Sequence, residues 1–152
     1  MKHKGFTILE VLLVLFILSL VVTMVAFSFS KFNSSKALNQ SASLVVSVLN
    51  EARSRTLSSV DASGYGINFQ ESQVVLFKGT VYSPSDPSNI VTGINPLVNL
   101  RNIALLGGGT SVVFKRLTGN VDEAGTLELF LKATPETFRT VSISSTGISE
   151  SD

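Results

Sequence analysis

The fold of this chain is decided near its start by the stretch Gly5-Phe6-Thr7-Ile8-Leu9-Glu10 and by the apolar run that continues from it to Phe29. Between Phe6 and Phe29 the only charged residue is Glu10. A run of this length exceeds the roughly 20 residues that a helix needs to cross a ~30 Å hydrocarbon core. The sequence therefore predicts a membrane-spanning helix over residues 6–29.

Glu10 is the feature that a plain single-pass anchor leaves unexplained. A lone carboxylate near one end of a spanning segment costs about 2.5 kcal/mol or more unless another group compensates its charge. One interpretation therefore gives Glu10 a positive partner. The alternative makes it a carboxylate near the lipid headgroups that stabilises the helix N-terminus by about 0.3–1 kcal/mol.

A secretory signal peptide is a second interpretation of the same segment. Ala26-Phe27-Ser28 fits a small-x-small cleavage site. However, the apolar run before it is longer than the 7–15 residues typical of such peptides, and Glu10 lies where that run would begin. Charge counting leaves the orientation in the membrane open, because two lysines lie on each side of the run, namely Lys2 and Lys4 before it and Lys31 and Lys36 after it.

The composition argues against several classes of function. The chain has 152 residues, 12 basic and 11 acidic side chains, no cysteine and a single histidine, His3. Such a balanced charge predicts no nucleic-acid partner. Without cysteine, and with its one histidine in the leader, the chain offers neither a thiol nucleophile nor the side chains of a histidine-based metal site. We expect no metal, no cofactor and no enzymatic activity.

The apolar run continues into an amphipathic helix. No glycine or proline occurs between Phe6 and Ser63. Apolar residues recur at three- and four-residue steps from Leu38 to Ala52, and Glu51 with Arg55 forms an i,i+4 pair. These patterns predict one helix from Phe6 to about Leu57, ~75–80 Å long at 1.5 Å per residue. The alternative is two helices, broken in the Ser- and Asn-rich segment 28–35.

The remainder of the chain changes to the period of β-strands. We expect a hairpin of strands 65–69 and 73–78, an exposed loop over 80–96, and further strands over 98–106, 111–117, 126–131 and 138–144. Because few helical patterns intervene, the sheet should be antiparallel and the fold α+β, with the apolar face of the long helix against the sheet. The predicted organisation is leader 1–5, transmembrane half-helix 6–29, amphipathic half-helix 30–58, β-rich domain 64–148 and acidic tail 149–152.

Two short motifs in this domain are interpreted as ordinary structural elements and not as binding sites. Gly107-Gly108-Gly109 is followed by no phosphate-binding pattern, so we expect a hairpin turn. Lys115-Arg116 is predicted to lie in a strand, with one of the two side chains facing inward or sideways.

The N-terminal residues resemble the signature of type IV prepilins: a short basic leader, Gly5, Phe6, three further residues, Glu10 and an uninterrupted apolar helix. The resemblance implies that prepilin peptidase cuts between Gly5 and Phe6 and N-methylates Phe6. A glycine before the bond suits close approach by a protease, although it is also an ordinary flexible residue before a helix. The resemblance makes Glu10 the assembly residue, fifth in the mature chain, whose carboxylate pairs with the Phe6 ammonium of a neighbouring subunit.

The strands resemble, less specifically, the H-type minor pseudopilins of type II secretion and related minor pilins, through Val112–Gly119, Leu127–Leu131 and Val141–Ile148. The resemblance implies a minor pilin or pseudopilin in a bacterial inner membrane, single-pass, with its globular domain outside the cytoplasm. Its partners would be prepilin peptidase, other pilin or pseudopilin subunits, an assembly platform protein and membrane lipid. The alternative is an adhesin or DNA-uptake receptor displayed on the filament, with the loop 80–96 as its recognition element.

Overall fold

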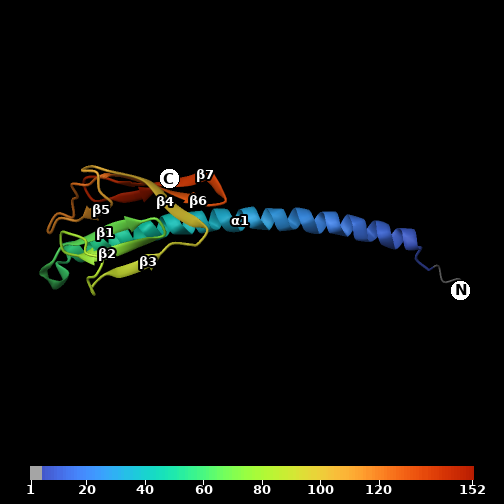
Figure 1. Ribbon diagram of the computed structural model, residues 1–152, viewed down its shortest axis with the longest axis horizontal. Coiled ribbons are helices and arrows are strands. Elements are labelled where there is room, and N and C mark those ends of the chain that lie inside the picture. The colour runs from blue at the N-terminus through green and yellow to red at the C-terminus, as the bar shows by residue number, and fades with distance from the viewer. Residues whose placement is uncertain (1–4) are drawn as a thin grey trace. The chain divides into compact units, whose positions relative to one another are not determined.

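The computed structural model describes residues 5–152 (Figure 1), except that the side chains of Ala26, Phe27 and Ser30 are not described. Most of the leader, including His3, therefore lies outside the described residues. The chain divides into two compact units, one ending at Ser35 and the other comprising Lys36–Asp152. Each unit is described by itself below.

Helix α1 (Ile8–Leu57) is a single α-helix of 50 residues, as the absence of glycine and proline predicts. No break occurs within 28–35, so the two-helix alternative is not observed. The helix begins two residues later than predicted because Thr7 caps it: the Glu10 amide donates to Thr7 Oγ1 at 3.2 Å. The predicted pair is present too, with Arg55 Nη2 2.7 Å from Glu51 Oε1.

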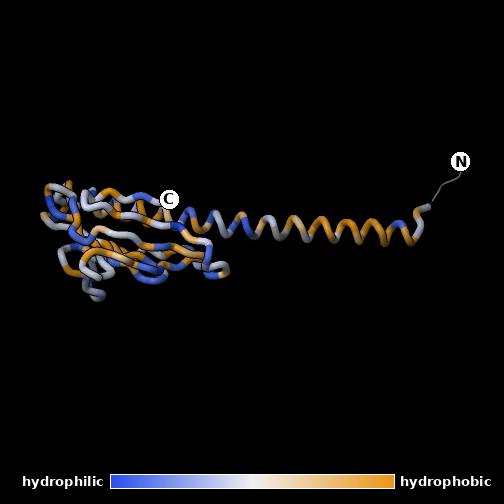
Figure 2. The backbone as a smooth tube through the Cα atoms, turned by 90° about the horizontal axis from the view of Figure 1, so that it is seen from above, coloured by the Kyte–Doolittle hydropathy of each residue, from blue (hydrophilic) through white to orange (hydrophobic). Residues whose placement is uncertain are grey.

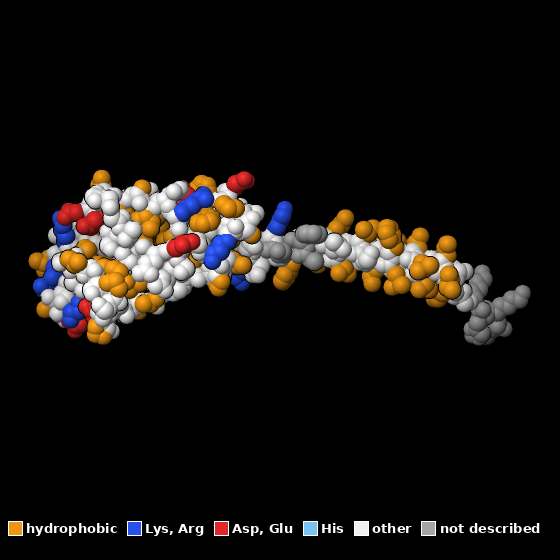
Figure 3. All heavy atoms as spheres, viewed as in Figure 1, with side chains coloured by type: hydrophobic (Ala, Val, Ile, Leu, Met, Phe, Trp, Pro, Cys, Tyr) orange, Lys and Arg blue, Asp and Glu red, His pale blue; other side chains and the backbone are white. Residues whose placement is uncertain are grey.

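The first unit contains the apolar part of α1. Within the described residues, Ile8–Val25 is long and apolar enough to cross a membrane, and none of it is buried inside the protein. Figure 2 shows this apolar stretch along the tube, and Figure 3 shows its side chains on the surface. The hydroxyls of Ser19 and Thr23 donate to the carbonyls of Phe16 and Ser19, at 2.8 and 2.7 Å. Both hydroxyl groups therefore have a hydrogen-bond acceptor within the helix, which avoids the cost of an unpaired donor in an apolar environment.

In the second unit α1 is amphipathic. Residues that recur at three- and four-residue steps are buried, while intervening ones such as Asn39 and Ser47 are exposed. This is the apolar stripe that the sequence predicts. The buried apolar residues of the helix are Ala37, Leu38, Ala42, Val45, Val48, Leu49 and Ala52.

The strands form two antiparallel four-stranded sheets and not one, which corrects the predicted single sheet. The first has the order β3-β2-β1-β5 and the second β4-β6-β7-β8. The first sheet consists of β1 (Tyr65–Gln70), β2 (Gln73–Lys78), β3 (Ile90–Gly93) and β5 (Ser111–Val113). The second consists of β4 (Val98–Leu105), β6 (Gly125–Leu131), β7 (Thr134–Ile143) and β8 (Ser149–Ser151).

Several predicted boundaries differ from those observed. The predicted loop 80–96 contains β3, and the predicted tail 149–152 forms β8, because each short segment adds to the edge of a sheet that the rest of the chain has already built. β5 ends at Val113 and not at Leu117, since the chain enters a turn after Phe114 that is closed by the Gly119 amide on the Lys115 carbonyl. β7 begins at Thr134, four residues early, because it pairs back on β6 through a tight connection after Leu131.

Both sheets share one core with α1. Figure 1 shows the strands around the last part of this helix. The helix stripe belongs to the same cluster of buried side chains as Ile67 and Leu76 of the first sheet and Leu129 and Val141 of the second. The α+β class is therefore confirmed, with the helix packed on two sheets.

The first sheet also buries side chains on its other face. Phe77 is 1% exposed but is not part of the shared core. It occupies the space left by Gly66, where a Cβ would lie 2.5 Å from the Phe77 ring. The ring of Tyr82 packs against Phe77 with centroids 5.5 Å apart. The segment after β2 therefore folds back over the sheet.

Candidate functional site

The predicted site residues lie together at the start of α1. Gly5, Phe6 and Thr7 precede the helix without regular secondary structure. Apart from Gly5 itself and its two chain neighbours, no described atom lies within 4 Å of the Cβ position of Gly5, and Phe6 is 81% exposed. Glu10 lies in the first turn of the helix. The bond between Gly5 and Phe6 is thus accessible from solvent in an irregular segment, which is the form of backbone that a protease can bind.

Thr7 is a site residue that the sequence reasoning missed. Its Oγ1 accepts from the Glu10 amide, and its carbonyl accepts from the Val11 amide at 3.2 Å. The signal was present as Thr-x-x-Glu ahead of an apolar run, the pattern of a helix capping box. This cap uses the backbone amide of Glu10, and among the described residues no group is hydrogen-bonded or ion-paired to its carboxylate.

The carboxylate lies beside an apolar groove on the helix surface. Phe6 and Glu10 line this groove of about 250 Å³ together with Val11, Val14 and Leu15. The described part of a single chain therefore presents an unpaired negative charge among apolar side chains. Such an arrangement is costly in lipid unless a cation is brought to it.

The part of the chain that the structure describes offers no cluster suited to metal chemistry. Among residues 5–152, no three His, Cys, Asp or Glu side chains are grouped so that they could hold a metal ion.

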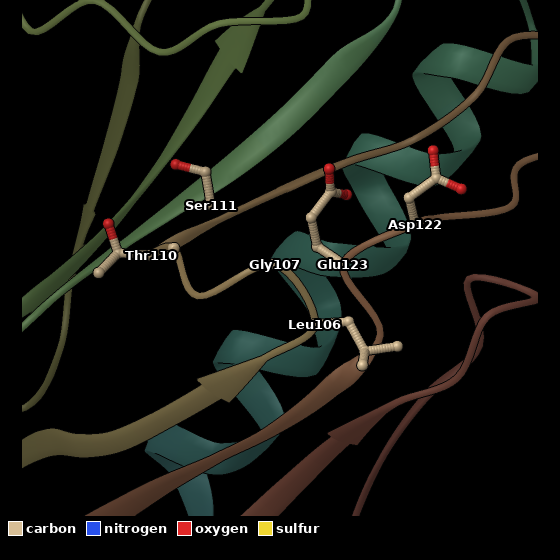
Figure 4. A pocket seen from close by; sticks show the side chains of 7 residues that line it. Leu106, Gly107, Thr110, Ser111, Asp122 and Glu123 are labelled. Atoms are coloured by element: carbon tan, nitrogen blue, oxygen red, sulfur yellow. The ribbon is translucent and has the colours of Figure 1, made fainter.

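The glycine triplet is a turn but not the predicted hairpin. Gly107 and Gly108 have φ of +87° and +70°, which favours glycine, and the turn carries the chain from β4 of one sheet to β5 of the other. It borders a groove of about 420 Å³ whose wall includes Asp122 and Glu123 (Figure 4). Two carboxylates at this groove disfavour a phosphate ligand.

Lys115 and Arg116 lie beyond the end of β5, which corrects their predicted place in a strand. Both are exposed, and Lys115 Nζ is 2.5 Å from Asp122 Oδ1. The basic pair thus lies in a turn that ends at Gly119, whose amide donates to the Lys115 carbonyl at 2.8 Å.

The segment between β2 and β3, where a recognition element was expected, is held by its own polar groups. The Asp86 carboxylate accepts from the Ser88 amide and hydroxyl at 2.8 and 2.7 Å, and these bonds lower the pKa of Asp86 below its ordinary value of 3.8. Asn89 Nδ2 donates to the Ser83 carbonyl at 2.7 Å. Tyr82 accepts at its hydroxyl from Gln70 Nε2 at 3.1 Å.

Comparison with known proteins agrees with the N-terminal geometry and with the fold. A family model, the prokaryotic N-terminal methylation motif, matches residues 1–26. The type IV minor pilin FimU of Pseudomonas aeruginosa strain PAO1 is similar in structure, with a TM-score of 0.58 and 15% identity over 76% of this chain and 92% of that chain. No curated protein sequence matches. The chain therefore carries the N-terminal methylation motif of type IV prepilins on the α+β fold of a type IV minor pilin.

Proposed function

We propose that this chain is a minor pilin or pseudopilin, a structural subunit of a type IV pilus or a type II secretion filament. The observation that carries the proposal is the site at the start of α1. An accessible Gly5-Phe6 bond precedes a capped helix whose apolar surface is not buried within the chain. A helix of this kind is stable only in lipid or against other subunits.

In this proposal prepilin peptidase cuts after Gly5 and N-methylates Phe6. The leader 1–5 is cytoplasmic, residues 6–29 cross the inner membrane, and the amphipathic half-helix 30–58 carries the β-rich domain outside the cytoplasm. Other pilin or pseudopilin subunits, an assembly platform protein and lipid are the partners. Loss of the leader supplies the new positive charge at Phe6 that can compensate the carboxylate of Glu10 in a neighbouring subunit.

The pairing of Glu10 with the Phe6 ammonium of a neighbour accounts for the position of both groups. They line one apolar groove on the helix. At an effective dielectric constant near 20, two such charges about 4 Å apart attract by about 4 kcal/mol before the cost of desolvation. The resulting preference is large enough to select a correctly placed subunit during assembly.

The alternative function, a filament-displayed adhesin or DNA-uptake receptor, would depend on the segment between β2 and β3. The polar groups of Asp86, Ser88 and Asn89 are engaged with that segment itself. We therefore favour the structural role.

Mass spectrometry of the protein from its native host tests the proposal. We expect a chain that begins at N-methylated Phe6, and an uncut precursor in the membrane when Gly5 is replaced by leucine. A matched control is Gly93→Leu, at another exposed glycine with nothing within 4 Å, which should leave processing unchanged. An N-terminus at Met1 or at Phe29 would contradict the proposal.

A further inference from the structure

An exposed leucine in a rigid turn is the feature that neither the core nor the N-terminal site explains. Leu117 is 83% exposed and has φ of +71°. Bulky side chains rarely adopt this left-handed conformation, and glycine or asparagine would serve the turn better. Leucine here contributes nothing to the core, so its presence requires another reason.

The turn that holds Leu117 is braced at both ends. The amides of Gly119 and Lys115 donate to the carbonyls of Lys115 and Asn120, each at 2.8 Å. Gly119 is buried against α1, where a Cβ would lie 3.0 Å from Arg53 Nε. The turn therefore presents Leu117 and the neighbouring exposed Arg116 in one fixed arrangement.

A groove of about 430 Å³ lies on the second sheet, over the start of β6 and the connection between β7 and β8. Ile143 and Ile148 supply apolar wall, and Ile148 is 53% exposed. Glu150 lies in the same wall and is exposed, and no ion pair involves its carboxylate among the residues that the structure describes.

The turn and the groove complement each other in shape and charge. The turn presents an apolar side chain beside the Arg116 guanidinium, and the groove presents apolar side chains beside the Glu150 carboxylate. Within residues 5–152 neither of these two charged groups has an ion pair. The turn and the groove belong to neighbouring parts of one unit, because a Cβ on Gly147 would collide with the Gly119 carbonyl oxygen. The high exposure of Leu117 shows that it does not fill the groove of its own chain.

We propose that Leu117 of one copy of this chain inserts into the groove formed by Ile143, Ile148 and Glu150 of a second copy, where Arg116 pairs with Glu150. The inference rests on the proposed function as a filament subunit and names a contact between globular domains in addition to the helix contact at Glu10. The occupant of the groove is thus a second copy of this chain.

Because the full chain contains no cysteine, introduced cysteines report this contact directly. Two differently tagged full-length chains, Leu117→Cys and Ile148→Cys, are co-expressed, extracted in mild detergent and oxidised. We expect a disulfide-linked heterodimer in much higher yield than from Val81→Cys with Ile148→Cys, since Val81 is equally exposed, at 80%, but lies outside the turn. Equal yields from the two pairs, or capture of Leu117→Cys only by a different protein, would overturn the proposal.

Charge reversal tests the second half of the contact in the same cross-linking assay. Adding Arg116→Glu to the Leu117→Cys chain should lower the heterodimer yield several-fold, and adding Glu150→Arg to its partner should restore it. Unchanged thermal unfolding would show that these exposed substitutions leave the fold intact. A yield insensitive to Arg116→Glu would overturn the pairing. Cross-linking needs no processing, so failure here is distinct from failure of the proposed function, which would appear as an uncut N-terminus in the host.

Discussion

At Glu10 the structure shows a backbone contact that is independent of the carboxylate. The backbone amide of Glu10 takes part in the Thr7 cap, which stabilises the helix N-terminus. Its carboxylate takes no part in that hydrogen bond, and the proposed pairing with a neighbouring subunit would use this group. The cap therefore does not depend on the side chain at position 10, so a substitution of Glu10 tests the carboxylate alone.

Glu10→Ala is expected to leave membrane insertion and the β-rich domain intact, while lowering incorporation into filaments by at least about tenfold. The loss follows because even about 1.4 kcal/mol of the charge pairing is worth a factor of ten. Immunoblotting of purified filaments against total membrane protein measures it. Glu51→Ala is the matched control, since its exposed pair with Arg55 contributes only about 0.3–0.5 kcal/mol. Unchanged incorporation would contradict charge pairing for this subunit. That result is the one expected of a first subunit at a filament tip, because it has no neighbouring amine to pair with.

Gly66→Ala should destabilise the protein by about 1–3 kcal/mol, because the added Cβ would meet the Phe77 ring at 2.5 Å and the Val112 carbonyl oxygen at 2.7 Å. Thermal unfolding of the full chain in detergent, followed by circular dichroism, should show a Tm lower by several degrees. Gly93→Ala is the control, as nothing lies within 4 Å of its Cβ position, and it should change stability little. Equal Tm values for the two variants would refute the close packing at Gly66.

Among the elements, the segment between β2 and β3 shows how a polar connection acquires a fixed conformation. Asp86 and Ser88 close a local turn, while Tyr82 packs on Phe77 from the same segment. The lowered pKa of Asp86 means that the ionised carboxylate is favoured in the folded chain. Its contribution to stability is therefore present above the ordinary aspartate pKa and is lost as the pH falls through the lowered value.

Ser88→Ala should raise the pKa of Asp86 towards 3.8, because it removes the side-chain hydrogen bond that contributes most to the shift. Carboxyl carbon chemical shifts in an NMR titration of both proteins measure this directly. Ser85→Ala, at an exposed serine of the same segment, serves as the control and should leave the titration unchanged. If Asp86 in the unmodified chain titrates at or above 3.8, the hydrogen bonds do not have the assigned effect.

At the scale of the whole molecule, the second unit has a core to which α1 contributes one wall. This explains why the helix stripe from Ala37 to Ala52 is buried although the helix before it is not. The domain therefore depends on part of the helix for its own stability, in addition to any role of that helix in assembly.

A fragment that begins at Asn33 is expected to be soluble and to unfold cooperatively, because it keeps the entire buried stripe of α1. A fragment that begins at Ser54 should aggregate, since it exposes the apolar sheet faces that the stripe covers. A core of this size is not stable without the apolar area that the stripe buries. Urea unfolding and size-exclusion chromatography distinguish the two. A well-folded monomer beginning at Ser54 would show that the helix is not part of the core.

The sequence by itself determined the long helix, the apolar part of it that is long enough to cross a membrane, the β1–β2 hairpin and the α+β class. These features depend on local patterns: an apolar run, a stripe of period 3.6 and the alternation of short strands. The pattern of Gly5, Phe6 and Glu10 was recognisable for the same reason, because these residues are close together in the sequence. Gly5 and Phe6 directly precede α1, and Glu10 lies in its first turn.

Only the tertiary structure decided that the strands form two sheets, that β3 and β8 exist, and that Leu117 stands exposed beside Arg116. The edge strands β3 and β8 are three or four residues long, too short for a periodic signal, and form because a neighbouring strand offers free hydrogen-bonding groups. The turn at Gly107 and Gly108 carries the chain from β4 of the second sheet to β5 of the first, and which sheet each strand joins depends on pairing between strands that are distant along the chain. Long-range contacts of this kind leave no pattern in the sequence, because the residues that make them are distant along the chain.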